Sequence, residues 1–174
     1  MGSRRAHLAA LLFLGLAGLA CGGPAVCSDV PFSAAAERDY AALRDTSAEP
    51  WVPPCAFQRD SSVARVFLDT VPGAEPHARM NFVVTRAGAP AFTLSETVAE
   101  VPFTQIPQGT HLVRIQTGSA IAEGFAGPSG NGPDIAYLRW RKDLFTFELS
   151  ATLGARQTES AVLQLVRGLM DDPD

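Results

Sequence analysis

Cysteine, charge and catalytic motifs are all scarce in this 174-residue sequence. Charged residues make up 18% of the chain and the formal net charge is −4, so the sequence lacks the basic excess of a nucleic-acid-binding surface. Hydrophobic residues make up 47%, which excludes disorder throughout the chain, and the length suits one domain rather than two.

Motifs that would hold a metal ion or a nucleophile are missing as well. The two histidines beyond the N-terminal region, His77 and His111, form neither an HxH nor an HxxxH pair, so they lack the spacing of metal ligands. Ser129 lies among glycines but lacks the G-x-S-x-G spacing of a nucleophile elbow. We therefore expect no cofactor, no metal ion and no identifiable catalytic residue.

The longest uncharged apolar run lies at the N-terminus. Residues 8–20 (LAALLFLGLAGLA) follow Arg4 and Arg5. A helix of this length spans about 20 Å, whereas the hydrocarbon core of a membrane is about 30 Å thick. A positive flank, a short apolar run and small residues after it are typical of a signal peptide, so we expect residues 1–20 to be removed on export.

The end of this segment, Gly18-Leu19-Ala20-Cys21, resembles the cleavage motif of bacterial lipoprotein precursors. The resemblance implies that Cys21 carries a lipid and that the chain is cut before it. Gly18 and Leu19 depart from the usual motif, and Gly18 with Ala20 also fits ordinary signal peptidase, so a secreted protein is the alternative. Gly22 rather than Asp follows the cysteine, which by the same resemblance favours an outer-membrane anchor.

The three cysteines, Cys21, Cys27 and Cys55, favour the lipidated form. If Cys21 carries a lipid, Cys27 and Cys55 remain as an even pair in an oxidising compartment. Their spacing is not C-x-x-C, so we interpret the pair as a structural disulfide rather than a redox site. In the chain-entropy model a loop of this length stabilises the fold by about 3.6 kcal/mol.

The mature chain is acidic. Loss of Arg4 and Arg5 with residues 1–20 changes the formal net charge from −4 to −6. An acidic protein is not attracted to anionic lipids, so we expect it to contact the membrane through its N-terminal lipid alone. The expected location is the cell envelope, at the outer membrane or the cell surface.

The mature chain divides into three predicted parts. Residues 21–32 form a short tether, and residues 33–60 hold a helix followed by a proline-rich segment. Ser33 is a good N-cap for this helix, and Glu37 suits its first turn. Residues 61–174 form the main domain.

Five short runs with alternating apolar residues predict β-strands in the main domain. They are residues 63–69, 79–86, 110–117, 135–141 and 144–152. Residues 124–134 are rich in glycine and predict a long mobile loop. The one-sided apolar pattern is typical of an antiparallel sheet with one covered face.

The C-terminal segment predicts an amphipathic helix with Thr158 as its N-cap. Its apolar stripe consists of Val162, Leu165, Val166, Leu169 and Met170. We expect this stripe to cover the sheet face that bears Phe145, Phe147 and Leu149. The predicted fold class is α+β: an antiparallel sheet covered on one face by the C-terminal helix, plus a short N-terminal helix. In topology alone, residues 135–169, two strands followed by this helix, resemble the ends of many small exported bacterial proteins.

Single residues give few hints of function. His111 shares a strand face with Val113 and Ile115, so we interpret it as a half-buried, hydrogen-bonded histidine, with a ligand contact or a general base as the alternative. Trp51 and Trp140 are expected to pack in the core rather than to bind sugar.

Three functions stay open on the sequence alone. The first is a lipid-anchored, non-catalytic binding or structural module of the cell envelope, whose partner could be another envelope protein. The second is a small exported hydrolase or transferase with a site near His111. The third is a carrier of a small apolar ligand held between the sheet and the C-terminal helix.

Overall fold

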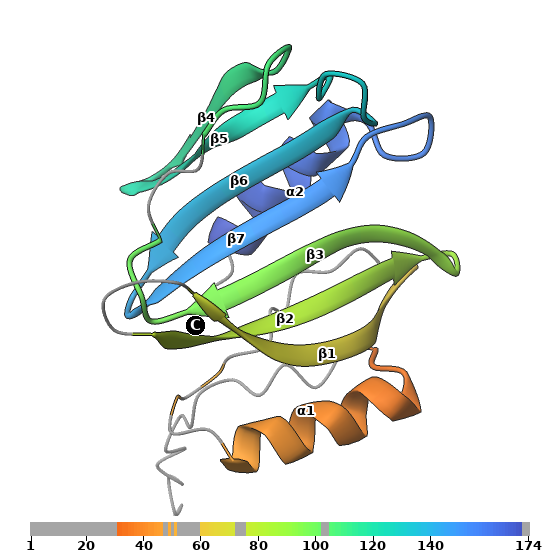
Figure 1. The fold of residues 1–174 in the computed structure, drawn as a ribbon, viewed down its shortest axis with the longest axis vertical. Coiled ribbons are helices and arrows are strands. Elements are labelled where there is room, and N and C mark those ends of the chain that lie inside the picture. The colour runs from red at the N-terminus through yellow and green to blue at the C-terminus, as the bar shows by residue number, and fades with distance from the viewer. Residues whose placement is uncertain are drawn as a thin grey trace, which may run out of the picture.

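A computed structural model of the chain describes residues 31–46, 49, 51, 60–71, 76–101 and 105–171. In these ranges it shows a seven-stranded antiparallel sheet with one helix before it and one after it (Figure 1). The predicted α+β fold class is confirmed. The signal peptide, the tether and the cysteines Cys21, Cys27 and Cys55 lie outside the described residues and stay predictions.

The sheet is built from two antiparallel meanders. The first consists of β1 (Ser61–Val71), β2 (His77–Arg86) and β3 (Ala89–Thr97). The second consists of β4 (His111–Thr117), β5 (Ala120–Gly127), β6 (Ile135–Lys142) and β7 (Phe145–Thr152). The strand order is β1-β2-β3-β7-β6-β5-β4, so β3 and β7 join the meanders while β1 and β4 are the edges. The connection from β3 to β4 therefore leads from the centre of the sheet to its far edge.

Both helices pack on the same face of the sheet, which we call the helix face. α1 (Ala34–Thr46) places Tyr40 against Phe82 of β2, with ring centroids 5.9 Å apart. α2 (Glu159–Asp171) packs against β4, β5 and β6, and Figure 1 shows it behind the second meander. The strand register connects the two contacts across one face through Phe82, Leu94, Leu149 and Leu138. Neither helix is long and apolar enough to cross a membrane.

Local sequence explains where both helices begin. The backbone N–H of Ala36 donates a hydrogen bond to Ser33 Oγ at 3.2 Å, and the N–H of Ala161 donates to Thr158 Oγ1 at 3.3 Å. Each bond satisfies a backbone donor that the first helical turn leaves without a partner. Both N-caps predicted from the sequence are thereby confirmed.

The hydrophobic core lies between the helix face and the helices. The predicted apolar stripe of α2 is buried, as are both tryptophans, with Trp51 at 5% and Trp140 at 4% exposure. Ala36 of α1 and Trp51 belong to the same core cluster as the sheet residues. The N-terminal helix is therefore packed on the main domain rather than separate from it.

The stripe of α2 packs on the sheet face that bears Phe145, Phe147 and Leu149, as the sequence predicts. Along that face the helix lies over β4, β5 and β6 rather than over β7. Aromatic side chains occupy the space next to the start of β7 instead. The ring of Trp51 lies 6.0 Å from that of Phe145, and Trp140 stacks on Phe147 at 5.5 Å.

The five predicted strands are confirmed with shifts of at most two residues at their ends, but the sequence does not predict β3 and β5. β3 begins at Ala89-Pro90, where proline suggests a turn, and it carries Glu96 within its apolar pattern. The predicted loop over residues 124–134 is wrong at its start, because Gly124 lies inside β5. A Cβ atom at Gly124 would lie 1.8 Å from the carbonyl oxygen of Tyr137, so the close approach of β5 and β6 requires glycine there.

Candidate functional site

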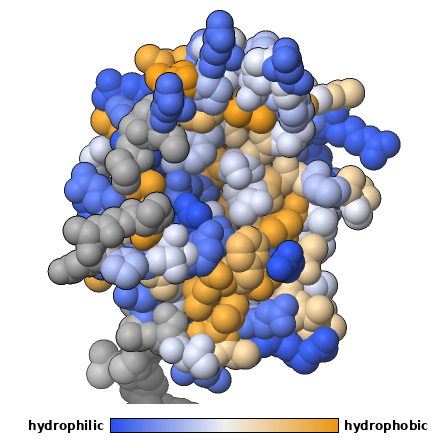
Figure 2. All heavy atoms as spheres, viewed as in Figure 1, coloured by the Kyte–Doolittle hydropathy of each residue, from blue (hydrophilic) through white to orange (hydrophobic). Residues whose placement is uncertain are grey.

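In the part of the chain that the structure describes, no helix packs on the face of the sheet opposite α1 and α2, and we call it the open face. Alternate residues along each strand point to it. Figure 2 shows hydrophilic side chains interleaved with a band of apolar side chains in the same view as Figure 1. The open face combines a row of charges, a hydrogen-bonded cluster and two hollows.

A row of alternating charges crosses the open face over the second meander. Arg114 of β4 pairs with Glu123 of β5. Glu123 also pairs with Arg139 of β6, which pairs in turn with Glu148 of β7. Opposite charges at paired positions stabilise a sheet, and here they favour the observed register. Arg114 Nε lies 3.9 Å from Glu123 Oε1, and the Arg139 guanidinium donates to the backbone carbonyl of Val101.

A hydrogen-bonded group of polar side chains continues this row toward β1. Arg79 donates two hydrogen bonds to the carboxylate of Asp69, at 2.9 and 2.7 Å, and one to Glu148 at 3.1 Å. The Tyr137 hydroxyl donates to the other oxygen of Glu148 at 2.5 Å. Asn81 donates to Asp69 at 3.0 Å. With a serine that bonds Asn81, these residues form the central cluster: Asp69, Arg79, Asn81, Ser95, Tyr137 and Glu148.

Asp69 and Arg79 of the central cluster hold one another in their ionised forms. The hydrogen bonds from Arg79 lower the pKa of Asp69 below its usual value, and the bond from Asn81 adds to this effect. The Asp69 carboxylate in turn raises the pKa of Arg79. A carboxylate whose oxygens are already occupied by donors is a weak general base. The cluster is therefore better suited to fixing the sheet than to moving protons.

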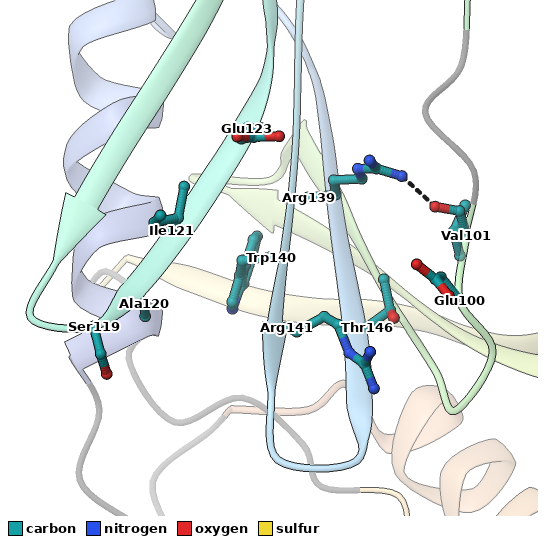
Figure 3. Close-up of a pocket in the computed structure, with 10 residues that line it drawn as sticks. All are labelled: Glu100, Val101, Ser119, Ala120, Ile121, Glu123, Arg139, Trp140, Arg141 and Thr146. Carbon is teal, nitrogen blue, oxygen red and sulfur yellow. Dashed lines mark hydrogen bonds between the residues drawn. The ribbon is translucent and has the colours of Figure 1, made fainter.

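One hollow of about 340 Å³ lies beside Glu123 and Arg139, the middle of the charged row, between β5, β6 and the segment that follows β3 (Figure 3). We call it the arginine pocket because Arg139 and Arg141 of β6 line it. Glu100 and Val101 form the wall across from them, and ten residues line it in all: Glu100, Val101, Ser119, Ala120, Ile121, Glu123, Arg139, Trp140, Arg141 and Thr146.

Two charges of the arginine pocket, those of Arg141 and Glu100, make no hydrogen bond and no ion pair among the residues that the structure describes. Both side chains are exposed, and Figure 3 shows them on either side of Thr146. The pocket thus offers one cation and one anion to a ligand.

A second hollow of about 440 Å³ lies next to the arginine pocket along the strands. We call it the tyrosine groove because Tyr137 lines it together with Phe125, and these two rings stack with centroids 5.2 Å apart. Val83 and Ile135 extend its apolar surface, and the hydroxyls of nearby threonine and serine residues line the rest. Since Tyr137 is two residues from Arg139 on β6, the groove and the pocket lie end to end on the open face.

His111 lies at neither hollow. It shares the helix face with Val113 and Ile115 as predicted, but its side chain is 58% exposed rather than half-buried. The predicted hydrogen bond exists, since its Nε2 lies 3.0 Å from Glu159 Oε1 in the first turn of α2. Burial fails because His111 is the first residue of an edge strand, where the start of α2 contacts its ring without covering it. The pair connects the sheet edge to the helix.

The remaining predictions concern packing and metals. Trp51 and Trp140 pack in the core as predicted. Within residues 31–46, 60–71, 76–101 and 105–171, no group of three His, Cys, Asp or Glu side chains is placed to hold a metal ion.

Sequence reasoning does not find the central cluster or the arginine pocket. A signal was present, because Glu123, Arg139 and Glu148 alternate with apolar neighbours along their strands. The pairing that brings Arg79 to Glu148 spans 69 positions and depends on the β3–β7 contact. A pattern read within single strands does not reveal that contact.

Comparison of the chain with protein-family models, curated proteins and solved structures finds no match.

Proposed function

We propose that this chain is an exported, lipid-anchored protein of the cell envelope that binds a small ligand on its open face without catalysing a reaction. The observation that carries the proposal is the division of the sheet into two unlike faces. Both helices pack on one face, while the other face keeps two hollows beside a set of charges that already hold one another.

The N-terminal sequence supports the anchor. Arg4, Arg5 and residues 8–20 form a signal-peptide pattern that ends at Cys21. A lipid on Cys21 would tether the domain to a membrane and leave the open face available to a ligand. The alternative remains a secreted protein that binds the same ligand in solution.

The rigidity of the open face supports binding rather than catalysis. The carboxylates Asp69 and Glu148 are both bonded to Arg79, so neither is placed to act as a mobile acid or base. His111 is the candidate general base of the enzyme alternative. It is exposed and hydrogen-bonded to Glu159, away from both hollows. A preformed, hydrogen-bonded surface loses little entropy when a ligand binds.

The packing of the helix face disfavours the carrier alternative. Leu138, Leu149, Val162 and Val166 are each 0% exposed in the layer between the sheet and α2. An apolar ligand in this layer would have to displace close-packed side chains, which is costly.

The anchor is tested by Cys21→Ser in the producing cell. We expect this variant to lose the lipid and to accumulate as the uncut precursor, because the thiol is the attachment site. Intact mass and detergent-phase partitioning give the readout. Cys27→Ser is the matched control and should keep the lipid. If Cys21→Ser partitions and migrates like the parent, the anchor is wrong.

Binding at the open face is tested by equilibrium dialysis of the full protein in detergent against low-mass compounds extracted from the cell envelope. We expect mass spectrometry to find compounds that the parent retains and that a Glu100→Gln, Arg141→Gln double variant loses. A Glu37→Gln, Arg156→Gln double variant removes the same charges elsewhere and should retain them. Equal retention by both variants, or none by the parent, would refute ligand binding at this site.

A further inference from the structure

The two charges left over in the arginine pocket define the class of ligand. We propose that the arginine pocket binds a zwitterion, with an anionic oxygen group of the ligand on Arg141 and its ammonium group on Glu100. This inference rests on the proposed function and names the ligand of the same site.

The other two charges of the pocket each have a protein contact. The Arg139 guanidinium donates to the carbonyl of Val101, and Glu123 lies 3.9 Å from Arg114. Arg141 and Glu100 therefore remain for a ligand. They come from different elements, β6 and the segment after β3, so they approach a bound molecule from different walls.

The backbone on both sides of Glu100 is fixed to the sheet. The Thr146 hydroxyl donates to the carbonyl of Ala99 at 2.8 Å, and Arg139 donates to that of Val101. The N–H of Ala99 also donates to Thr97 Oγ1 at 3.2 Å. These bonds hold Glu100 at the pocket, while its carboxylate has no partner in the described ranges of the chain. Such preorganisation is what a binding site needs, because the ligand does not have to order the wall.

The balance of charge excludes ligands of one sign. The lining carries two arginines and two glutamates, so a simple anion would meet Glu100 and a simple cation would meet Arg141. A zwitterion pairs with both, and charge-assisted hydrogen bonds are the strong ones. The volume of about 340 Å³ is at the lower end for small-molecule pockets, which suits an amino acid, a dipeptide or a zwitterionic headgroup.

Isothermal titration of the full protein in detergent tests the proposal with alanyl-alanine and glycerophosphoethanolamine as probes. The first represents a free peptide and the second a lipid headgroup, so the tighter probe identifies the source. We expect at least one to bind. For alanyl-alanine, N-acetylation or C-amidation removes one charge and should each weaken binding about tenfold or more.

Variants assign each charge to its partner. Arg141→Gln should abolish the difference between the free dipeptide and its amide, and Glu100→Gln should abolish the difference between the free and N-acetylated forms. Both residues are exposed, so we expect both variants to fold, and Arg156→Gln is the matched control. Binding of neither probe, or equal binding of the charge-deleted dipeptides, would overturn the proposal. If the dialysis experiment still finds a ligand lost in the double variant, the function stands and only the ligand class is wrong.

Discussion

At the scale of single residues, position 124 requires glycine because the backbone of β6 lies too close for any side chain. Gly124→Ala would bring a Cβ atom to 1.8 Å from the Tyr137 carbonyl oxygen, so β5 and β6 would have to separate. We expect a loss of about 1–3 kcal/mol in the free energy of unfolding, the range typical of overpacking. Thermal melts followed by circular dichroism would measure it.

Gly168 provides the control for that experiment. It lies in α2, and nothing is within 4 Å of the position where a Cβ would be added. Gly168→Ala should therefore stabilise the protein by about 0.5–1 kcal/mol, because alanine favours helix. A Gly124→Ala variant that melts at the parental temperature would show that β5 and β6 lie further apart.

We expect ionisation of Tyr40 to destabilise the fold at alkaline pH. Its burial against the sheet raises its pKa to about 12, and the carboxylate of Glu96 adds to the shift. In an unfolded chain tyrosine titrates near pH 10. The neutral Tyr40 hydroxyl therefore adds fully to the free energy of unfolding below about pH 10. This stabilisation is lost as the pH rises toward about 12.

Urea unfolding between pH 8 and 11.5 would reveal this loss. Tyr40→Phe should be less stable at pH 8, since the hydroxyl donates to the Trp51 carbonyl at 3.2 Å, but its stability should fall less with rising pH. Tyr137→Phe keeps Tyr40 and should retain the alkaline loss. Parallel pH profiles for Tyr40→Phe and the parent would contradict the assignment.

At the scale of secondary-structure elements, the contribution of α2 to stability can be separated from that of its surface contacts. Leu165 is buried against the sheet, so Leu165→Ala should cost about 2–5 kcal/mol. His111→Ala removes only the exposed pair with Glu159, whose worth is about 0–1 kcal/mol. Thermal or urea unfolding of both variants gives the comparison. A Leu165→Ala variant as stable as the parent would mean that α2 is not needed for the fold.

The elements also show how far sequence reasoning reaches. Both helices are predictable because their signals are local: a capping side chain at Ser33 or Thr158 and an apolar stripe after the latter. β3 and β5 are not predicted because Glu96 and Gly124 interrupt the apolar alternation. Glycine is required at position 124 by the close approach of β6. The central cluster is not predicted from the sequence either, because Arg79 and Glu148 meet only after the strands have paired.

At the scale of the whole molecule, the N-terminal part is bound to the sheet edge by main-chain hydrogen bonds. The N–H of Val63 donates to the carbonyl of Pro31 and the N–H of Ser33 donates to that of Val63, both at 2.9 Å. Trp51 is buried in the same core. These contacts fix the chain near both cysteines in sequence, Cys27 before Pro31 and Cys55 after Trp51, which favours their pairing.

We therefore expect Cys27 and Cys55 to be oxidised to one another in protein collected from the cell envelope. Peptide mass mapping under non-reducing conditions would identify the linked peptides. Reduction should lower the melting temperature, because a bond closing a loop of this length contributes about 3.6 kcal/mol in the chain-entropy model. Two thiols that react with an alkylating reagent in the native protein would disprove the disulfide.

The pairing of β3 with β7 has a consequence for synthesis. The first meander is complete once β3 has been made, but its inner edge pairs with β7, the last of the strands that the structure describes, with Phe92 opposite Ala151. Until that strand emerges, β3 presents unpaired backbone donors and acceptors that other chains can capture. The interval between the two meanders is thus the period in which the nascent protein most needs protection from aggregation.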